Sequence, residues 1–150
     1  MAVIVDLSVY SFLFAFMTVS TEPSPMPTAT LDAFQWRNRV VLSFIADEEM
    51  QAARDQREYR RKTLGEWRNR DLVLIEVGPR NRVLVDGKEN DSIDGAGLRQ
   101  RFAAASEKYV AVLVGKDGSE KLRSDRAITN DMLFATIDAM PMRRREMRRK

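Results

Sequence analysis

Three short runs of apolar residues divide the later part of the chain, and each has the length of a buried strand. They cover residues 39–45, 71–77 and 109–114. Runs of roughly four to eight residues rich in Val, Ile and Leu are typical of strands buried on both faces of a sheet. A fourth, polar strand is predicted over 120–123, because the Asp-Gly pair at 117–118 is a strong hairpin-turn signal.

Helical patterns lie between these strands. Asp47 is a predicted helix N-cap, with Glu48 and Glu49 in the first turn and basic residues accumulating later, which suits the dipole of a helix. The pattern therefore predicts one helix over residues 47–68. A shorter helix is expected over about 96–105, where apolar residues again recur at helical spacing.

The last predicted helix begins at Thr129, a residue type favoured at N-caps. Its apolar stripe consists of Met132, Leu133, Thr136, Ile137 and Met140. Pro141 is expected to end or kink this helix, because the residue before a proline avoids the α region.

The order of elements predicts the fold class. A strand, helix, strand, helix and strand are followed by a hairpin strand and a closing helix, so a parallel βαβ unit leads into an antiparallel hairpin. This layout is typical of an α/β, thioredoxin-like fold, with a small mixed β-sheet flanked by helices. The length of 150 residues suits one domain, which we place at 31–150 with a basic C-terminal segment.

The N-terminal residues carry a different pattern. Residues 9–19 form an apolar run that is too short to span a bilayer, which takes about 20 residues. Its length fits the core of an export signal over residues 1–20, followed by a Pro-rich spacer at 21–30. These features predict a periplasmic or secreted protein. The alternative is that the run forms a strand or helix of the fold and that the protein is cytoplasmic.

Composition removes several kinds of chemistry. The chain contains no cysteine and no histidine, which excludes a dithiol redox pair, a disulfide, a Ser-His-Asp triad and a zinc site built on Cys or His. The net charge of +3 is not spread evenly, because residues 31–140 carry equal numbers of basic and acidic side chains, whereas 141–150 carry six basic residues and one acidic one. A uniformly basic, nucleic-acid-binding domain is therefore not predicted.

Four segments resemble a known family. They are Phe34–Arg39, Arg70–Val73, Val114–Gly118 and, most specifically, Ile137–Met147 with its string MPMRRREM. Together they resemble the bacterial members of the DUDES family over residues 31–149. That family is a domain of unknown function with a thioredoxin-like fold, related to modules of the extracellular Equarin and sushi-repeat proteins. The resemblance implies this fold and export, and it implies no established activity.

In active oxidoreductases of the thioredoxin fold, the redox pair lies where the first strand meets its helix. Here Asp47, Glu48 and Glu49 stand at that place, and negative charge would raise the pKa of a thiol rather than lower it. One interpretation is a metal-dependent or acid-base enzyme that uses these carboxylates. The interpretation we favour is structural, as an N-cap and a favourable first turn.

The basic C-terminal segment is the main candidate for interaction. Its arginines are Arg143, Arg144, Arg145, Arg148 and Arg149. Glu146 can pair with an arginine three residues away on a helix, which favours ordered structure over a loose tail. We expect a protein partner, with contact to an anionic membrane or polymer as the alternative and nucleic acid not favoured. We expect no cofactor and no metal, and a non-catalytic interaction module.

Overall fold

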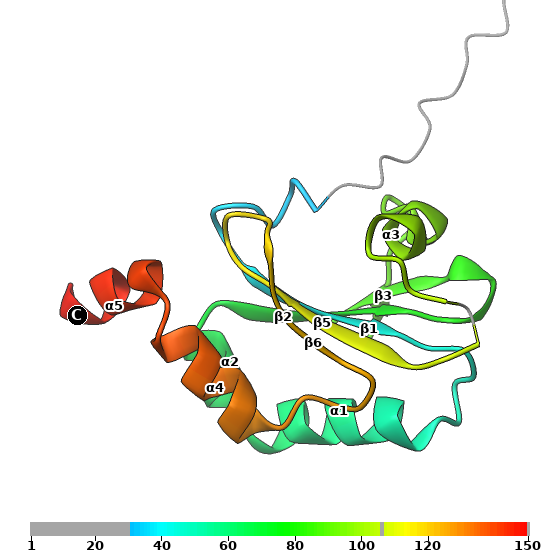
Figure 1. Cartoon of the computed structure of the whole chain (residues 1–150), viewed down its shortest axis with the longest axis horizontal. Helices are drawn as coiled ribbons and strands as arrows, with labels where there is room; N and C mark the ends of the chain where they lie inside the picture. Colours follow the sequence, from blue (N-terminus) through cyan, green and yellow to red (C-terminus); the bar gives the residue numbers. More distant parts are fainter. Residues whose placement is uncertain (1–30, 106, 150) are drawn as a thin grey trace, which may run out of the picture.

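A six-stranded mixed β-sheet lies between helices on both of its faces (Figure 1). The computed structural model describes residues 31–105 and 107–149. The predicted signal segment, 1–20, and the predicted spacer, 21–30, lie outside the described residues.

The sheet contains the predicted parallel unit and hairpin. Its strands are β1 (Arg39–Phe44), β2 (Leu72–Val77), β3 (Val83–Val85), β4 (Lys88–Glu89), β5 (Val110–Val114) and β6 (Glu120–Ser124). In the order β4-β3-β2-β1-β5-β6, β1 pairs parallel with β2 and the other neighbouring strands pair antiparallel. Central β1 aligns Val41 with Leu74 on one side and with Leu113 on the other.

The helices divide between the two faces. They are α1 (Gln51–Lys62), α2 (Leu64–Asn69), α3 (Gly95–Arg101), α4 (Asn130–Asp138) and α5 (Pro141–Arg148), with a 3-10 turn η1 at Pro79–Asn81. Figure 1 shows α1, α2 and α4 on one face and α3 on the other, while α5 lies beyond the end of α4. Among the described residues, no helix has both the length and the apolarity needed to cross a membrane.

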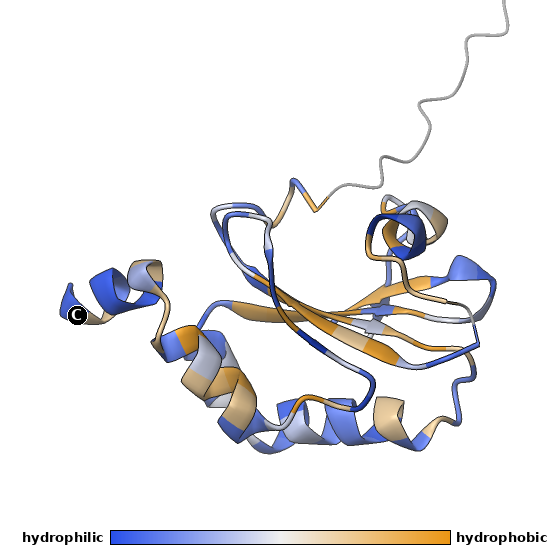
Figure 2. Cartoon of the chain, viewed as in Figure 1, coloured by the Kyte–Doolittle hydropathy of each residue, from blue (hydrophilic) through white to orange (hydrophobic). Residues whose placement is uncertain are grey.

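Two apolar cores explain why the strands read as unbroken apolar runs. Successive side chains of a strand point to opposite faces. In β1, Val40, Leu42 and Phe44 belong to the core beneath α3, whereas Val41 and the adjacent Ile45 belong to the core beneath α1, α2 and α4. The central strands β1, β2 and β5 are accordingly the most continuously hydrophobic segments in Figure 2, whereas β6 is largely hydrophilic.

The predicted helix over residues 47–68 was wrong in two respects. It begins only at Gln51, with Met50 rather than Asp47 at the N-cap, and it is interrupted at Thr63, where φ is −128° and ψ is 37°. Asp47 instead accepts a hydrogen bond from the backbone N–H of Glu49 at 2.9 Å. Aspartate favours such local turns as strongly as it favours helix caps, so its side chain fixes a turn before the helix.

The chain after residue 128 follows the prediction more closely. Thr129 caps α4, since its Oγ1 accepts from the backbone N–H of Met132 at 3.4 Å. Pro141 ends this helix and opens α5, where its missing N–H has no intrahelical partner to lose. The predicted apolar stripe is narrower than expected, because Leu133 and Ile137 are buried while Met132 is exposed.

Candidate functional site

The C-terminal helix α5 is anchored to the ends of α2 and α4 by Arg143, one of the five arginines predicted for interaction. Arg143 is only 3% exposed. Its Nη1 donates to the backbone carbonyl of Asn69 at 2.8 Å, and its Nε donates to Asp138 at 3.3 Å. The structure therefore uses Arg143 to hold the helix rather than to present charge to solvent.

Glu146 is the second anchor of α5. Its carboxylate accepts from Lys116 Nζ at 2.8 Å and from both Nη groups of Arg39 at 3.2 and 3.3 Å, and it lies 3.6 Å from Arg143 Nη1. Although burial by itself raises the pKa of the Glu146 carboxyl, the hydrogen bonds from Lys116 and Arg39 outweigh it and hold that pKa below its ordinary value. The carboxylate is therefore ionised across the neutral range.

A further set of ion pairs joins the end of α2 to α4. Arg70 donates to Asp138 at 2.7 Å and to Glu66 at 2.6 Å, and its guanidinium lies 4.2 Å from the centre of the Phe134 ring. Burial raises the pKa of the Asp138 carboxyl, but the bonds from Arg70 and Arg143 outweigh it and lower that pKa. Ion pairs between basic and acidic side chains therefore hold α2, α4 and α5 together at this end of the domain.

The other four arginines of α5 form an exposed surface, called the arginine face below. It consists of Arg144, Arg145, Arg148 and Arg149, all exposed. None of their side chains has a hydrogen bond or ion pair with the part of the chain that the structure describes. Since a helix turns about 100° per residue, Arg144, Arg145 and Arg148 lie on the side away from Arg143 and Glu146, and Arg149 follows them as the C-cap.

A hollow lies at the N-terminal end of this helix, between α5 and the β5–β6 hairpin. This α5 cleft has a volume of about 280 Å³. It is lined by Arg39, Gly115, Lys116, Asp117, Lys121, Met140, Pro141, Met142 and Arg145. Basic groups and a short apolar stretch therefore share one depression, and Arg145 belongs to both the cleft and the arginine face.

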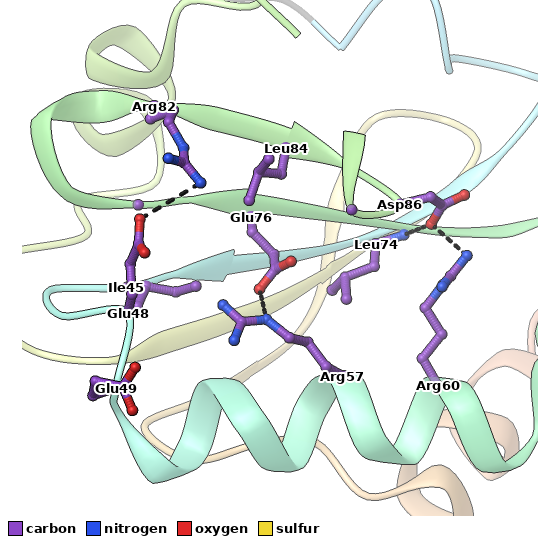
Figure 3. Close-up of a pocket in the computed structure, with 12 residues that line it drawn as sticks. Ile45, Glu48, Glu49, Arg57, Arg60, Leu74, Glu76, Arg82, Leu84 and Asp86 are labelled. Atoms are coloured by element: carbon purple, nitrogen blue, oxygen red, sulfur yellow. Dashed lines mark hydrogen bonds and ion pairs between the residues drawn. The ribbon is translucent and has the colours of Figure 1, made fainter. Parts of the chain in front are cut away.

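A larger hollow lies at the place that thioredoxin-like oxidoreductases use for redox chemistry. This α1–β3 cleft has a volume of about 380 Å³ and opens where parallel β1 and β2 end (Figure 3). It is lined by Ile45, Glu48, Glu49, Arg57, Arg60, Leu74, Glu76, Gly78, Arg82, Leu84, Asp86 and Gly87. Ligands of open α/β sheets commonly bind outside the carboxyl ends of the strands, so the location suits binding.

The structure does not gather the predicted acidic residues into one site. Asp47 is used in its own turn, Glu49 accepts from Arg54 at 2.6 Å, and Glu48 lies 3.5 Å from Arg82. Over residues 31–105 and 107–149, no three His, Cys, Asp or Glu side chains lie where they could hold one metal ion. Glu48 and Glu49 line the α1–β3 cleft as separate rim groups.

Sequence reasoning missed the charged floor of that cleft. Glu76, 3% exposed, is the next-to-last residue of β2 and accepts from Arg57 Nε at 2.7 Å. Asp86, in the turn between β3 and β4, accepts from the backbone N–H of Leu74 at 3.0 Å and pairs with Arg60 at 3.0 Å. Glu76 itself could have indicated this site, because a single carboxylate within an apolar strand is expected to be buried and therefore to need a hydrogen-bonded or charged partner.

Comparison with known proteins gives a family and a fold. The model of a domain of unknown function, DUF4174, matches residues 30–146. Among solved structures, the reduced 2-Cys peroxiredoxin of Plasmodium vivax superposes with a TM-score of 0.54 at 13% sequence identity, over 78% of this chain and 84% of that chain. No curated protein matches the sequence. At this identity the peroxiredoxin shows the fold alone, and the fold is thioredoxin-like as predicted.

Proposed function

We propose that this chain, which belongs to the family defined by the domain of unknown function DUF4174, is a non-redox, thioredoxin-like interaction module of an exported protein. Its arginine face would bind an acidic surface of a protein partner. The observation that carries this function is the contrast within α5, where Arg143 and Glu146 fix the helix while four neighbouring arginines remain without partners among the described residues.

The arrangement of the arginine face costs stability when nothing is bound. Arg144 and Arg148 are four residues apart, as are Arg145 and Arg149, and like charges at this spacing destabilise a helix by a few tenths of a kcal/mol per pair. A partner that supplies carboxylates would relieve this repulsion. Arginine also forms bidentate bonds with carboxylates, so a rigid array of four can select a matching acidic surface.

The α5 cleft favours a protein partner over a phosphate polymer. Met140, Pro141 and Met142 give one wall apolar character, while Lys116 and Lys121 add basic groups. A protein segment carries both apolar and acidic side chains and can fill such a mixed hollow, whereas a phosphate backbone would leave the apolar wall uncovered. The equal numbers of basic and acidic residues in 31–140 also give nucleic acid no wider positive surface to follow.

The finer family relationship that we propose is with the bacterial DUDES proteins and, through them, with Equarin and sushi-repeat modules. It is supported by the string MPMRRREM within residues 137–147, of which the DUF4174 match covers all but the last residue. Export is supported by the apolar run at 9–19 and the Pro-rich stretch after it. N-terminal sequencing of the protein from a periplasmic fraction tests export, and an intact Met1 on cytosolic protein contradicts it.

A capture experiment in the native cell tests the partner. The tagged full chain is compared with the variant Arg144→Gln/Arg145→Gln/Arg148→Gln/Arg149→Gln. A matched control removes four exposed basic charges elsewhere on the molecule: Arg54→Gln, Arg61→Gln, Lys62→Gln and Arg126→Gln. We expect an acidic protein that co-purifies with the wild type and the control but not with the α5 variant, and whose purified form binds about tenfold or more weakly to that variant.

Two further ligands separate this function from its alternatives. Heparin and vesicles that contain an anionic phospholipid are offered to the same three proteins. Suppose that no protein is captured, and that either ligand binds in a salt-sensitive way that depends on the arginine face. The result would then indicate an anionic polymer or membrane as the partner instead of a protein. If the wild type and both variants captured the same proteins, the arginine face would not be the surface that binds the partner. The metal-dependent alternative has no support in the geometry, since Asp47, Glu48 and Glu49 take separate contacts.

A further inference from the structure

Three arginines line the α1–β3 cleft, and most of their hydrogen-bonding capacity is unused. A guanidinium group has five N–H donors. Arg57 donates one hydrogen bond, from Nε to Glu76. Arg82 makes ion-pair contacts at 3.5 Å to Glu48 and 3.8 Å to Glu89, but its side chain has no hydrogen bond with any described residue. The cleft therefore holds more donors than its own walls satisfy.

Arg60 adds a buried donor to the same cleft. Its Nη2 lies 3.0 Å from Asp86 Oδ1, while its Nε is buried and has no hydrogen-bond partner within the described part of the chain. A buried N–H without a partner costs about 1–3 kcal/mol, so native structures usually satisfy such groups by protein, water or a ligand. Arg60 Nε is therefore a further hydrogen-bond donor in a residue that lines this cleft.

Glu76 orients Arg57 toward the hollow. Because the buried Glu76 carboxylate takes the Nε–H of Arg57, the two terminal nitrogens of that guanidinium point away from Glu76 and into the cleft (Figure 3). Arg82 approaches from the opposite side, from the segment before β3 (Figure 3). Opposed guanidinium groups bind carboxylate and phosphate oxygens in bidentate geometry, which a single lysine cannot reproduce.

Glu48 is a competitor for the same position. Its carboxylate is the nearest acceptor to Arg82 Nη2, at 3.5 Å, and both side chains are largely exposed. Exposed pairs of this kind contribute about 0–1 kcal/mol, so an incoming oxyanion can displace Glu48 at little cost. The apolar side chains of Ile45, Leu74 and Leu84 line the remainder of the cleft and suit the carbon part of an organic ligand.

We propose that the α1–β3 cleft binds the oxyanion group, a carboxylate or a phosphate, of a small organic molecule between Arg57 and Arg82. The volume of about 380 Å³ lies in the range of small-molecule sites. The site occupies the position of the redox centre in thioredoxin-like enzymes, but it binds an anion instead of holding a thiolate. It is independent of the arginine face, which lies on α5.

Calorimetric titration of the full chain with succinate and, separately, with inorganic phosphate at low ionic strength tests this site. We expect saturable binding of at least one probe, and the one that binds distinguishes a carboxylate from a phosphate ligand. Arg82→Gln should weaken binding about tenfold, and Glu48→Gln should tighten it about threefold by removing the competing carboxylate. Arg61→Gln, which removes an exposed charge on the same helix, should leave binding unchanged, as should the four-residue variant of the arginine face.

Arg57 is tested together with its partner, because a single substitution would leave the Glu76 charge buried and unpaired. The double variant Arg57→Gln/Glu76→Gln removes both charges, so that neither is left buried and unpaired, and should abolish binding. The proposed site is overturned if neither probe saturates by about 10 mM. It is also overturned if Arg82→Gln has no effect, or if Arg61→Gln weakens binding as much as Arg82→Gln does.

Discussion

Arg39 and Glu146 form a two-pronged ion pair, with Arg39 Nη1 and Nη2 donating to the two carboxylate oxygens at 3.2 and 3.3 Å, although 107 residues separate them. Arg39 is the first residue of β1 and is 1% exposed, while Glu146 lies on the last helix. The pair therefore joins the central strand of the sheet to α5. The position of the arginine face depends on it.

Glu146→Gln should destabilise the domain more than an ordinary surface substitution does. It leaves the buried Arg39 and the largely buried Lys116 without their shared carboxylate, and breaking a buried pair on one side costs about 3–5 kcal/mol. We expect a loss of about 3 kcal/mol in the free energy of unfolding, measured with urea. Glu58→Gln, which breaks the exposed pairs to Arg61 and Lys62, should have a much smaller effect, because such pairs are screened by solvent. Equal losses for the two variants would contradict a structural role for Glu146.

The stability of the domain should fall steeply in acid. The pKa values of Glu146 and Asp138 are below their ordinary values in the folded protein. The stability that these carboxylates contribute is therefore fully present above the unfolded-state pKa, at about pH 4, and is lost as the pH falls through the lower folded-state pKa. Urea unfolding measured across this range should show a shallower pH dependence in Glu146→Gln. An unchanged slope would assign the acid sensitivity to other groups.

Two glycine-to-alanine substitutions should have opposite effects. Gly95 opens α3, and a Cβ at this position would collide with the backbone carbonyl of Asn81. Gly65 lies in α2, where the Cβ of an alanine would meet no neighbouring atom within 4 Å. We expect Gly95→Ala to lower the free energy of unfolding by the cost of overpacking, about 1–3 kcal/mol, and Gly65→Ala to raise it by up to about 1 kcal/mol, so that their melting temperatures shift in opposite directions. Differential scanning calorimetry of the two variants checks both signs.

Tyr109 should ionise well above the ordinary tyrosine range. Burial beneath α1 raises its pKa to about 12, against which the hydrogen bond from Ser43 acts only partly. Its neutral form stabilises the fold below the unfolded-state pKa near 10, and this contribution is lost as the pH rises through about 12. Ultraviolet difference titration should show one late-ionising tyrosine that is missing in Tyr109→Phe. Ionisation of Tyr109 near pH 10 would contradict its burial.

The sheet was predictable because burial on both faces leaves a clear trace in the sequence. Val40 and Val41 are adjacent and both buried, so β1 shows no polar alternation and differs plainly from the amphipathic segments around it. The start of α1 was not predictable in the same way. Asp47 could cap a helix or a tight turn, and that choice depends on how the following residues pack rather than on Asp47 itself.

The two candidate sites also differ in how far the sequence predicts them. The sequence indicated an ordered basic helix through the spacing of Arg143 and Glu146, but it could not show which of three consecutive arginines would be buried. The buried one is set by the angle at which α5 meets the sheet. The α1–β3 cleft depends on Arg57 and Arg82, which come from different elements and become neighbours of one hollow only through the tertiary fold.

The distance along the chain between Arg39 and Glu146 also has a consequence for biogenesis. While the protein is being synthesised, Arg39 has left the peptidyl transferase centre long before residue 146 is added, so a partly made domain has the guanidinium without its carboxylate. Contacts of such high sequence separation form late, because loop closure must come first. The sheet end near Arg39 and Lys116 then lacks the carboxylate that both groups share, until α5 is made and brings Glu146 to it.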